Sequence, residues 1–557
     1  MRRAFSLFKK QKRMSSYPSG RSAASLNRPS HTNWNANDDW FRYTRGRFLF
    51  NETQEMSIRC AKFNMNELVK RATESVGLTS AQCIRVEKFP DGMFNKTFLF
   101  TMHDGTQVVG KVPNPNAGRA HYTTASEVAT MDFARNVLRT PVPKVLAWSS
   151  KAEDNSVAGV QLSKVWPTMD IKQRFELVKT ILGYQKSWMS TSFTQYGSLY
   201  YSSDMEYPEG YDLVKGSMAI PKHRQFAVGP STGREFLDDG RIALDFDRGP
   251  WDSVERYKSA VGFREIACVQ NMAQLPRSLL SLYGPGTYCR SRSKKIAALR
   301  NYLRLVKYLL PTDLSITSAF LWHPDLHAEN IFVHPERPAE VLGIIDWQST
   351  ELLPLFDHAR LPYFLDYDGP PPTGIDPPAF PDDFGKLDTA KKAEAQDLYL
   401  KMPLSALYRR FTYSNNIALF KAMEFQQTTS FEMLLLAQNL LIDGEALYQS
   451  RCLDLEKEWT ALPGVQASGN PPFPLQFSAD EIALINEDAS GAIKGMELMR
   501  SLRQSLGQMW PDKGVVRPGQ YDEVERLLDQ AKVELIDQLA HSETEKVAWE
   551  EAWPFDS

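Results

Sequence analysis

The chain is poor in the features that define small secreted proteins and membrane proteins. Its 557 residues contain five cysteines, an odd number without a Cys-x-x-Cys pair. This excludes a disulfide framework or a zinc ribbon and fits a reducing compartment. No apolar run is long enough to span a bilayer, so we expect a soluble protein without a transmembrane segment. Because the formal net charge is only −2 and the basic residues are spread out, nucleic acid is not an expected partner.

Acidic residues are missing from the first 37 positions, and the first one in the chain is Asp38. The same segment is rich in arginine, lysine and serine, with Phe5, Leu7 and Phe8 among the basic residues. Such a composition is typical of a mitochondrial transit peptide, and a plain disordered basic tail is the alternative. We therefore leave residues 1–37 out of the fold and predict a mitochondrial protein.

The length exceeds one hydrophobic core, and the composition is that of an ordinary globular protein with 42% hydrophobic and 24% charged residues. Alternation of apolar residues predicts strands at 84–89, 96–102 and 106–111, with Asp104-Gly105 as a hairpin turn. Two further strands are predicted at 142–148 and 160–165. Helical spacing dominates from Ile171 onward, with a helix predicted at 417–449, and residues 205–250 are predicted as an irregular insertion rich in glycine and proline. We expect an α+β protein with a β-rich part at 38–165 and a mainly helical part at 166–557.

The most informative stretch lies between His323 and Asp346. It contains the pattern His-x-Asp-x-x-x-x-Asn, carried by His323, Asp325 and Asn330. Apolar runs at 331–333 and 341–345, separated by a segment with two prolines, predict an antiparallel hairpin. Asn330 precedes the first run and Asp346 ends the second, so both should lie at the same end of this hairpin, within 321–347.

Oxygen-bearing side chains at that end suit a hard cation and a phosphate chain. Asn330 offers a neutral carbonyl and Asp346 a carboxylate, which makes them candidate metal ligands. Asp325 lies in the loop that leads into the hairpin, where it would accept a proton from the phosphate acceptor. We expect His323 to pack and hydrogen-bond the loop rather than to react.

A lysine and a glutamate precede this motif in the order that phosphate binding requires. Lys111 ends the third predicted strand, and Glu127 lies in the helix predicted at 124–138. An ion pair between them would direct the ammonium at the phosphates of ATP. The structural alternatives are an exposed strand end for Lys111 and a capping box between Thr124 and Glu127.

The loop between the first two strands, residues 90–95, holds a single glycine, Gly92, and ends at Asn95. A glycine in this hairpin is compatible with a flap over phosphates, but one glycine is not the glycine-rich loop of protein kinases. A plain hairpin is the alternative.

Two other interpretations of the central motif need testing. His323 and His327 are four residues apart and His334 is near, which would allow a zinc site. Pro324 and the loop context argue against a helical pair of histidines. Separately, Asp325 and Asp346 could each cap a turn, although that does not explain their combination with Lys111.

With its Ile-Asp-Trp sequence at 345–347, the motif resembles the aminoglycoside phosphotransferase and choline kinase-like group of small-molecule kinases. The stretches FRYTRGRFLFNE, GMFNKTFLFTM and LWHPDLHAENIFV resemble a fungal mitochondrial branch more closely. The resemblance implies a bilobal protein-kinase-like fold. It also implies ATP and Mg²⁺ as cofactors, with Asp325 as base, Asn330 and Asp346 as metal ligands, and Gly92, Asn95, Lys111 and Glu127 around the nucleotide.

The resemblance implies transfer of the ATP γ-phosphoryl group to a small molecule, but it does not supply the acceptor. The alternative is a kinase-like protein that binds nucleotide or acts as a scaffold without transferring phosphate.

Overall fold

The computed structural model describes residues 6–10, 33–148, 159–205, 213–214, 226–365, 375, 384–511 and 514–555. Within them, helices are combined with strands whose pairings are all antiparallel, as expected of the α+β class. Among the described helices, none is both long and apolar enough to cross a membrane.

The described strands are β1 (Ser6–Lys10), β2 (Arg47–Phe48), β3 (Cys83–Lys88), β4 (Asn95–Met102), β5 (Gln107–Pro113), β6 (Ala147–Trp148), β7 (Val160–Gln161), β8 (Ser198–Tyr201), β9 (Phe226–Gly229), β10 (Ala319–Leu321), β11 (Ile331–Val333), β12 (Val341–Ile344), β13 (Leu352–Pro354) and β14 (Val515–Val516).

The described α-helices are α1 (Glu52–Arg59), α2 (Met65–Glu74), α3 (Tyr122–Asn136), α4 (Leu162–Val165), α5 (Ile171–Trp188), α6 (Val254–Asn271), α7 (Arg292–Leu309), α8 (Leu314–Thr317), α9 (Leu355–His358), α10 (Thr389–Asn415), α11 (Ile417–Phe425), α12 (Thr429–Ala437), α13 (Glu445–Glu458), α14 (Pro463–Ala467), α15 (Ala479–Leu506), α16 (Tyr521–Leu539) and α17 (Glu543–Ala552).

The chain divides into two compact units. Unit 1 comprises Met1–Phe41, Ala61–Gly233 and Ser318–Glu424, and unit 2 comprises Arg42–Cys60, Arg234–Thr317 and Phe425–Ser557. The lobe boundary predicted between residues 165 and 166 falls inside unit 1, so the division into lobes stays a prediction. All of the predicted site residues belong to unit 1.

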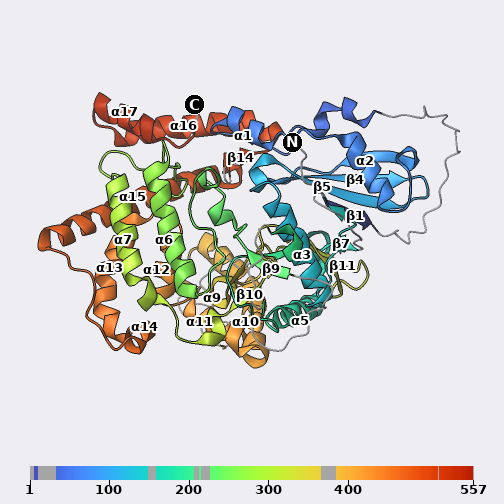
Figure 1. The fold of residues 1–557 in the computed structure, drawn as a ribbon. Coiled ribbons are helices and arrows are strands. Elements are labelled where there is room, and N and C mark those ends of the chain that lie inside the picture. Colours follow the sequence, from blue (N-terminus) through green and yellow to red (C-terminus); the bar gives the residue numbers. More distant parts are fainter. Residues whose placement is uncertain are drawn as a thin grey trace. The chain divides into compact units, whose positions relative to one another are not determined.

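The main sheet of unit 1 has the strand order β3-β4-β5-β1-β6. Phe98, Phe100 and Met102 alternate along β4 and are fully buried against the apolar side of α2, which lies over the strands in Figure 1. Gly105 has a φ of +79° in the β4–β5 turn, a conformation that glycine adopts without strain. This confirms the hairpin expected from Asp104-Gly105.

The register between β4 and β5 decides which way Lys111 points. Thr97 pairs with Lys111, and Phe98 pairs with Gly110. Since neighbouring residues on a strand face opposite sides of a sheet, Lys111 lies on the side away from the α2 core. The same alternation puts Asn95 on the side of Lys111.

The strand β1 was not expected, because residues 1–37 were left out of the fold. It pairs with β5 from Ser6 opposite Lys111 to Lys10 opposite Gln107, and also with β6. Without it, β5 would present an unpaired backbone edge, which is a ready template for an additional strand. The transit-peptide prediction for this segment stays a prediction.

The remainder of unit 1 is mostly helical around three small sheets. The helix α5 begins with a capping box between Asp170 and Gln173 and packs against α10. Its buried Trp188 forms edge-to-face contacts with Trp322 and Trp347, which flank the predicted hairpin in sequence. These ring contacts attach both ends of the 323–346 segment to α5, because aromatic pairs of this geometry stabilise beyond the burial of their area.

Some predicted elements are shorter than expected. The strand predicted at 142–148 is reduced to β6, because Pro141 and Pro143 cannot donate to a ladder. The strand predicted at 160–165 is β7 followed directly by α4. The helix predicted at 417–449 is divided into α11, α12 and the start of α13, with Thr428 capping α12 and Gly444 at φ +98° before α13.

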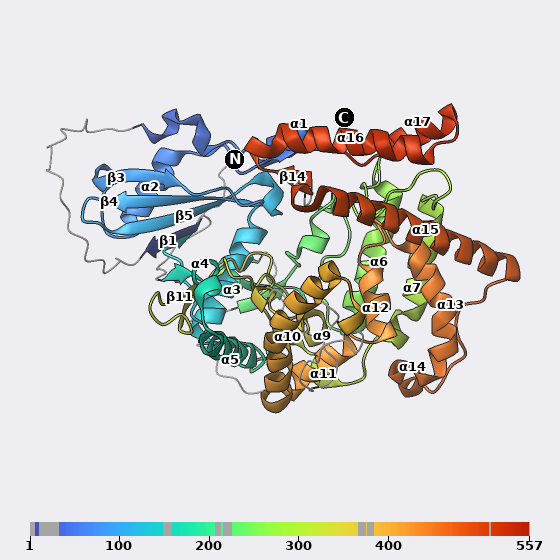
Figure 2. The ribbon, with the colours of Figure 1, turned by 180° about the vertical axis from the view of Figure 1, so that it is seen from behind.

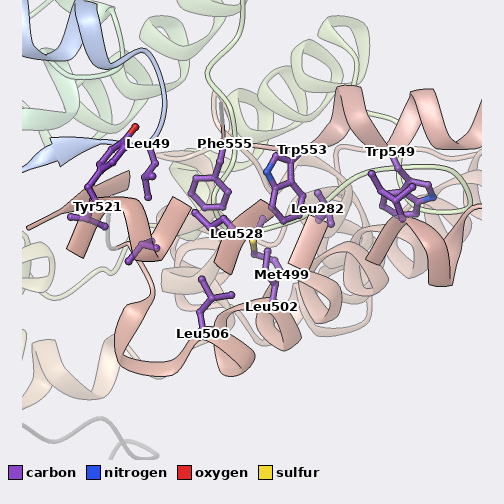
Figure 3. Close-up of a cluster of buried hydrophobic side chains, with 13 residues drawn as sticks. Leu49, Leu282, Met499, Leu502, Leu506, Tyr521, Leu528, Trp549, Trp553 and Phe555 are labelled. Carbon is purple, nitrogen blue, oxygen red and sulfur yellow. The ribbon is translucent and has the colours of Figure 1, made fainter. Parts of the chain in front are cut away.

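Unit 2 is a helical assembly in which α6 packs along α7, as Figures 1 and 2 show. An apolar cluster, drawn in Figure 3, brings the C-terminal segments together through Leu528, Trp549 and Phe555. A short β2–β14 ladder joins Phe48 to Val515. The insertion predicted at 205–250 lies partly outside the described residues. Its described part contains β9, which belongs to unit 1 and pairs there with β8.

Candidate active site

The predicted hairpin is present and has the predicted polarity. The strands β11 and β12 pair antiparallel with Ile331 opposite Ile344, and the Ile345 amide donates to the Asn330 carbonyl at 2.9 Å. Asn330 and Asp346 therefore lie at the same end of the hairpin. We call this end, with Asp325, the hairpin mouth.

The lysine of β5 reaches both predicted acidic partners. The Lys111 Nζ donates to Glu127 Oε1 at 2.6 Å and to Asp346 Oδ1 at 2.7 Å. The predicted ion pair between Lys111 and Glu127 is thus present, and Lys111 is not an exposed strand end. A single ammonium joins the sheet, α3 and the hairpin mouth.

The alternative use of Glu127 in a capping box is wrong. The helix α3 begins at Tyr122, two residues before Thr124, and its N-cap residue His121 makes no side-chain capping bond. Glu127 therefore lies beyond the first turn, where a glutamate can no longer reach the free backbone amides of a helix start. Its buried carboxylate bonds Lys111 instead.

The charges of this trio depend on one another. Burial lowers the pKa of Lys111, but attraction by Asp346 and Glu127 outweighs it and raises the pKa overall. Burial alone would raise the pKa of Asp346, yet the neighbouring ammonium holds it below its usual value. Burial dominates for Glu127 and raises its pKa. Lys111 stays charged and Asp346 stays ionised at neutral pH.

The amide of Asn330 is held so that its oxygen remains usable. Its Nδ2 donates to the Asp325 carbonyl at 2.9 Å and lies 3.3 Å from His327 Nε2. Its Oδ1 accepts no hydrogen bond from the described residues. When the amide nitrogen of an Asn donates to a protein group, the amide oxygen remains available to a ligand.

The predicted base is the most open member of the site. The side chain of Asp325 is 53% exposed, and its Oδ2 lies 3.2 Å from His327 Nε2. A hydrogen bond with Asp325 raises the pKa of His327. A carboxylate with this exposure and a free second oxygen can receive a proton from a bound acceptor.

His323 is structural, as the sequence predicted. Its Nδ1 accepts from the Asp325 amide at 3.1 Å, so the ring proton is on Nε2, which donates to the Ile345 carbonyl at 2.8 Å. Its ring lies 4.7 Å from that of Trp347. One neutral imidazole thereby ties the loop before β11 to the residue that precedes Asp346.

This arrangement makes stability depend on pH. Burial lowers the pKa of His323 from 6.5 to about 4. Because the folded state prefers the neutral ring, its contribution is complete above pH 6.5 and is lost as the pH falls toward 4. We expect about 3 kcal/mol of unfolding free energy to be lost over this window. Denaturant unfolding of the parent and of His323→Gln measures it, since the difference between them should shrink by that amount at pH 4. A difference that does not change with pH would contradict the assignment.

The zinc interpretation is wrong for the described part of the chain, where no cluster of histidine, cysteine and acidic side chains could hold a metal. Both ring nitrogens of His323 are used by backbone groups. The Nδ1 of His334 accepts from two amides of its own turn.

The loop predicted between the first two strands is present as a tight turn between β3 and β4, which we call the flap turn, and its use as a flap over phosphates stays a prediction. The Gly92 amide donates to the Asn95 carbonyl at 3.0 Å, and the Asn95 side chain reaches Gln348. A Cβ on Gly92 would meet the Asn95 carbonyl at 3.5 Å, an ordinary contact, and its φ is not in the left-handed region. The turn itself does not require glycine at this position.

We therefore expect Gly92→Ala to change the unfolding free energy by no more than about 0.5 kcal/mol, whereas Gly105→Ala in the next turn should cost about 1 kcal/mol because its φ is positive. Thermal unfolding of both variants checks this. Equal losses would show that Gly92 is required by the turn. A weaker affinity for Mg-ADP in stable Gly92→Ala would mark close approach of a phosphate.

The side chains that stabilise this turn were not predicted from the sequence. Asp91 is completely buried between Lys88, at 2.8 Å, and Lys96, at 3.2 Å. Both lysines lie on the α2 side of the sheet, since Lys88 and Lys96 flank the core residue Phe98 across β3 and β4. An aspartate between two lysines in a loop was the available signal. Gln348, beside the recognised Asp346, was also missed.

No protein-family model matches the chain. Among curated proteins, a subtelomeric hrmA-associated cluster protein of Aspergillus fumigatus is 25% identical over 514 residues, covering 85% of this chain and 97% of that protein. The altered inheritance of mitochondria protein 9, mitochondrial, of Saccharomyces cerevisiae is 24% identical over 542 residues, covering 81% and 83%. Its counterpart in Yarrowia lipolytica is 23% identical and covers 80% of both chains.

Two solved structures are similar in part. A protein described as an aminoglycoside phosphotransferase from Ralstonia eutropha has a TM-score of 0.29 at 14% identity, covering 75% of this chain and 92% of that one. The choline kinase of Cryptosporidium parvum has a TM-score of 0.30 at 10% identity, covering 73% and 98%. Both TM-scores are below 0.5, which is too low to establish a common fold.

The resemblance to a fungal mitochondrial branch that the sequence suggested is confirmed by the two yeast relatives. The named yeast relatives are mitochondrial proteins, which supports the mitochondrial location predicted from the basic N-terminal segment.

Proposed function

We propose that the chain is a bilobal, kinase-like phosphotransferase that moves the γ-phosphoryl group of ATP to a small-molecule acceptor in mitochondria. One observation carries the proposal. The ammonium of Lys111 bonds a carboxylate from α3 and a carboxylate from the hairpin mouth at the same time. A strand lysine, a helix glutamate and a hairpin aspartate in this relation are the groups that kinases place around ATP.

The donor set fits a hard cation and a polyphosphate. Asn330 Oδ1 and the Asp346 carboxylate would hold Mg²⁺, which prefers such oxygen ligands and neutralises charge on the phosphates. Lys111, held by Glu127, would contact phosphate oxygens. Asp325 would take the proton of the acceptor hydroxyl or amine. Gly92 and Asn95 would form the flap over the nucleotide.

We expect acceptor specificity to come from the helices of the C-terminal part at 166–557 and from the insertion at 205–250. The mitochondrial relatives and the basic segment 1–37, taken as a transit peptide, support the location.

A second function has its own supporting observation. The Lys111 ammonium is already satisfied by two carboxylates, and the flap is tied down through Asn95 rather than left open. A protein that binds nucleotide, or acts as a scaffold in mitochondrial maintenance, without transferring phosphate would tolerate this arrangement.

Thermal unfolding with and without Mg-ATP and Mg-ADP tests both functions, with Asp346→Ala as the variant that removes a metal ligand. We expect magnesium-dependent stabilisation of the parent and none of Asp346→Ala. Turnover on a panel of small alcohols and amines then separates the two functions, because binding without turnover supports the second. Absence of any Mg-nucleotide effect on the parent contradicts the phosphotransferase and the nucleotide-binding protein, and only a scaffold role would then remain.

A further inference from the structure

Gln348 lies two residues after Asp346 and uses both ends of its buried amide. Its Oε1 accepts from Asn95 Nδ2 at 2.6 Å, and its Nε2 donates to the Ala117 carbonyl at 3.2 Å. These partners belong to the flap and to the connection between β5 and α3. One neutral side chain therefore joins three segments that are far apart in sequence.

In the flap turn, Asn95 makes one hydrogen bond through its backbone and another through its side chain. Its carbonyl closes the turn by accepting from the Gly92 amide, and its side chain extends toward Gln348. The residue is buried, and its Oδ1 has no hydrogen-bond partner among the described residues. The bond to Gln348 is thus the contact that orients this amide.

At the other end, Gln348 lies in a segment with unusual backbone geometry. Asp346 and Ser349 have φ values of +64° and +58°, which non-glycine residues adopt only when the surroundings hold them. The Trp347 indole donates to the Ile344 carbonyl at 3.0 Å, and the Thr350 hydroxyl donates to the Trp347 carbonyl at 2.7 Å. Gln348 gives this turn a second link to the sheet, a neutral one, beside the ion pair between Asp346 and Lys111.

Two bonds of different kinds then cross the site on the same face of the sheet. The ionic one joins Lys111 to Asp346, and the neutral one joins Asn95 to Gln348. An incoming nucleotide competes for the ammonium and for the carboxylate, whereas the amide pair carries no charge that phosphate or metal could attract. The neutral bond can persist while the ionic one is exchanged.

We propose that Gln348 is a positioning residue, which holds the flap turn at 89–95 and the metal-ligand turn at 345–350 in one fixed arrangement for nucleotide binding. This inference rests on the proposed function. The amide is chemically suited to the task because it offers an acceptor and a donor together. A carboxylate in its place could accept from Asn95 but could not donate to the Ala117 carbonyl.

Hydrogen exchange of the ligand-free protein tests the linkage without any nucleotide. In Gln348→Met we expect amide exchange at 89–95 to rise at least about threefold, and in Asn95→Leu the same rise at 345–350, because each change releases the partner segment. The matched control is Gln107→Met, which removes an amide bond to Thr101 in the same sheet. Exchange that rises only around the substituted residue overturns the proposal.

Gln348→Glu separates the two halves of the contact. The flap at 89–95 should keep the parent's exchange at neutral pH, whereas the connection at 115–118 should exchange faster. Faster exchange at 89–95, or exchange at 115–118 that stays at the parent's rate, would contradict the assignment of one hydrogen bond to each end of the Gln348 amide.

Nucleotide affinity tests positioning itself. For Gln348→Met and for Asn95→Leu we expect the Kd for Mg-ADP and the KM for ATP to rise about tenfold each, the effect of one buried hydrogen bond, with kcat changed less than threefold. The double variant should also show about tenfold. A hundredfold effect in the double variant, or parent affinity in both single variants, overturns the inference. If the parent binds no Mg-nucleotide, the proposed function fails, and with it the positioning role, while the exchange data still decide whether the two turns are linked.

Discussion

Replacement of Asp325 by Asn is expected to lower the turnover number about a thousandfold, the loss usual for a general base in proton transfer. The side chain is half exposed and its partner in the described structure is His327, so folding should be little affected. The unfolding free energy should change by less than about 1 kcal/mol, and the Kd for Mg-ADP by less than threefold. Steady-state kinetics with an acceptor found in the turnover panel, together with calorimetric binding, measure both quantities.

The matched control is Glu329→Gln, which removes an exposed carboxylate from the same loop four residues away. It should keep parent kinetics. Unchanged turnover in Asp325→Asn would remove the assigned role of this residue, and an equal loss in Glu329→Gln would point to a general charge effect of the loop.

Replacement of Lys111 by Met should act on stability and on binding together. It leaves the Glu127 carboxylate, only 5% exposed, without its cation. Breaking a buried ion pair from one side costs about 3 kcal/mol or more, because the remaining charge has lost both water and partner. Affinity for Mg-ATP should fall at least tenfold, since we propose the ammonium as the contact to the phosphates. Denaturant unfolding and calorimetry provide the two readouts.

The double variant Lys111→Met/Glu127→Gln separates these effects. It removes the stranded carboxylate, so we expect most of the stability to return while nucleotide affinity stays low. Recovery of both would mean that Lys111 matters only for folding. If the unfolding free energy does not recover, the contact of Lys111 with Asp346, rather than that with Glu127, is the one that stabilises the fold.

The parts of the site that were predictable from sequence depend on local pattern and chain order. The hairpin followed from two apolar runs around a proline-containing turn, and its register placed Asn330 and Asp346 together. The contact between Lys111 and Glu127 followed from a strand succeeded by a helix. These relations span few residues, so alternation and helical spacing determine them.

The contacts that escaped prediction join segments far apart in the chain. Asn95 and Gln348 are separated by 253 residues, and the local periodicity of apolar residues does not indicate contacts over such a distance in the chain. The strand β1 was missed because a basic, acid-free segment has the composition of a disordered leader, while its pairing depends on the free edge of β5. Burial of Asp91 also escaped prediction, because a loop aspartate is normally exposed and the two lysines around it were the only signal in the sequence.

The single ammonium of Lys111 has a consequence for how a ligand arrives. It bonds the carboxylates of Glu127 and Asp346, and Asp325 adds a third negative charge at the hairpin mouth, so the site should repel a polyanion. Nucleotide alone should therefore bind weakly. A divalent ion would reduce this repulsion by neutralising phosphate charge, in addition to taking part in the chemistry. Occupancy would then follow the concentration of the magnesium complex in the surrounding compartment rather than that of total ATP.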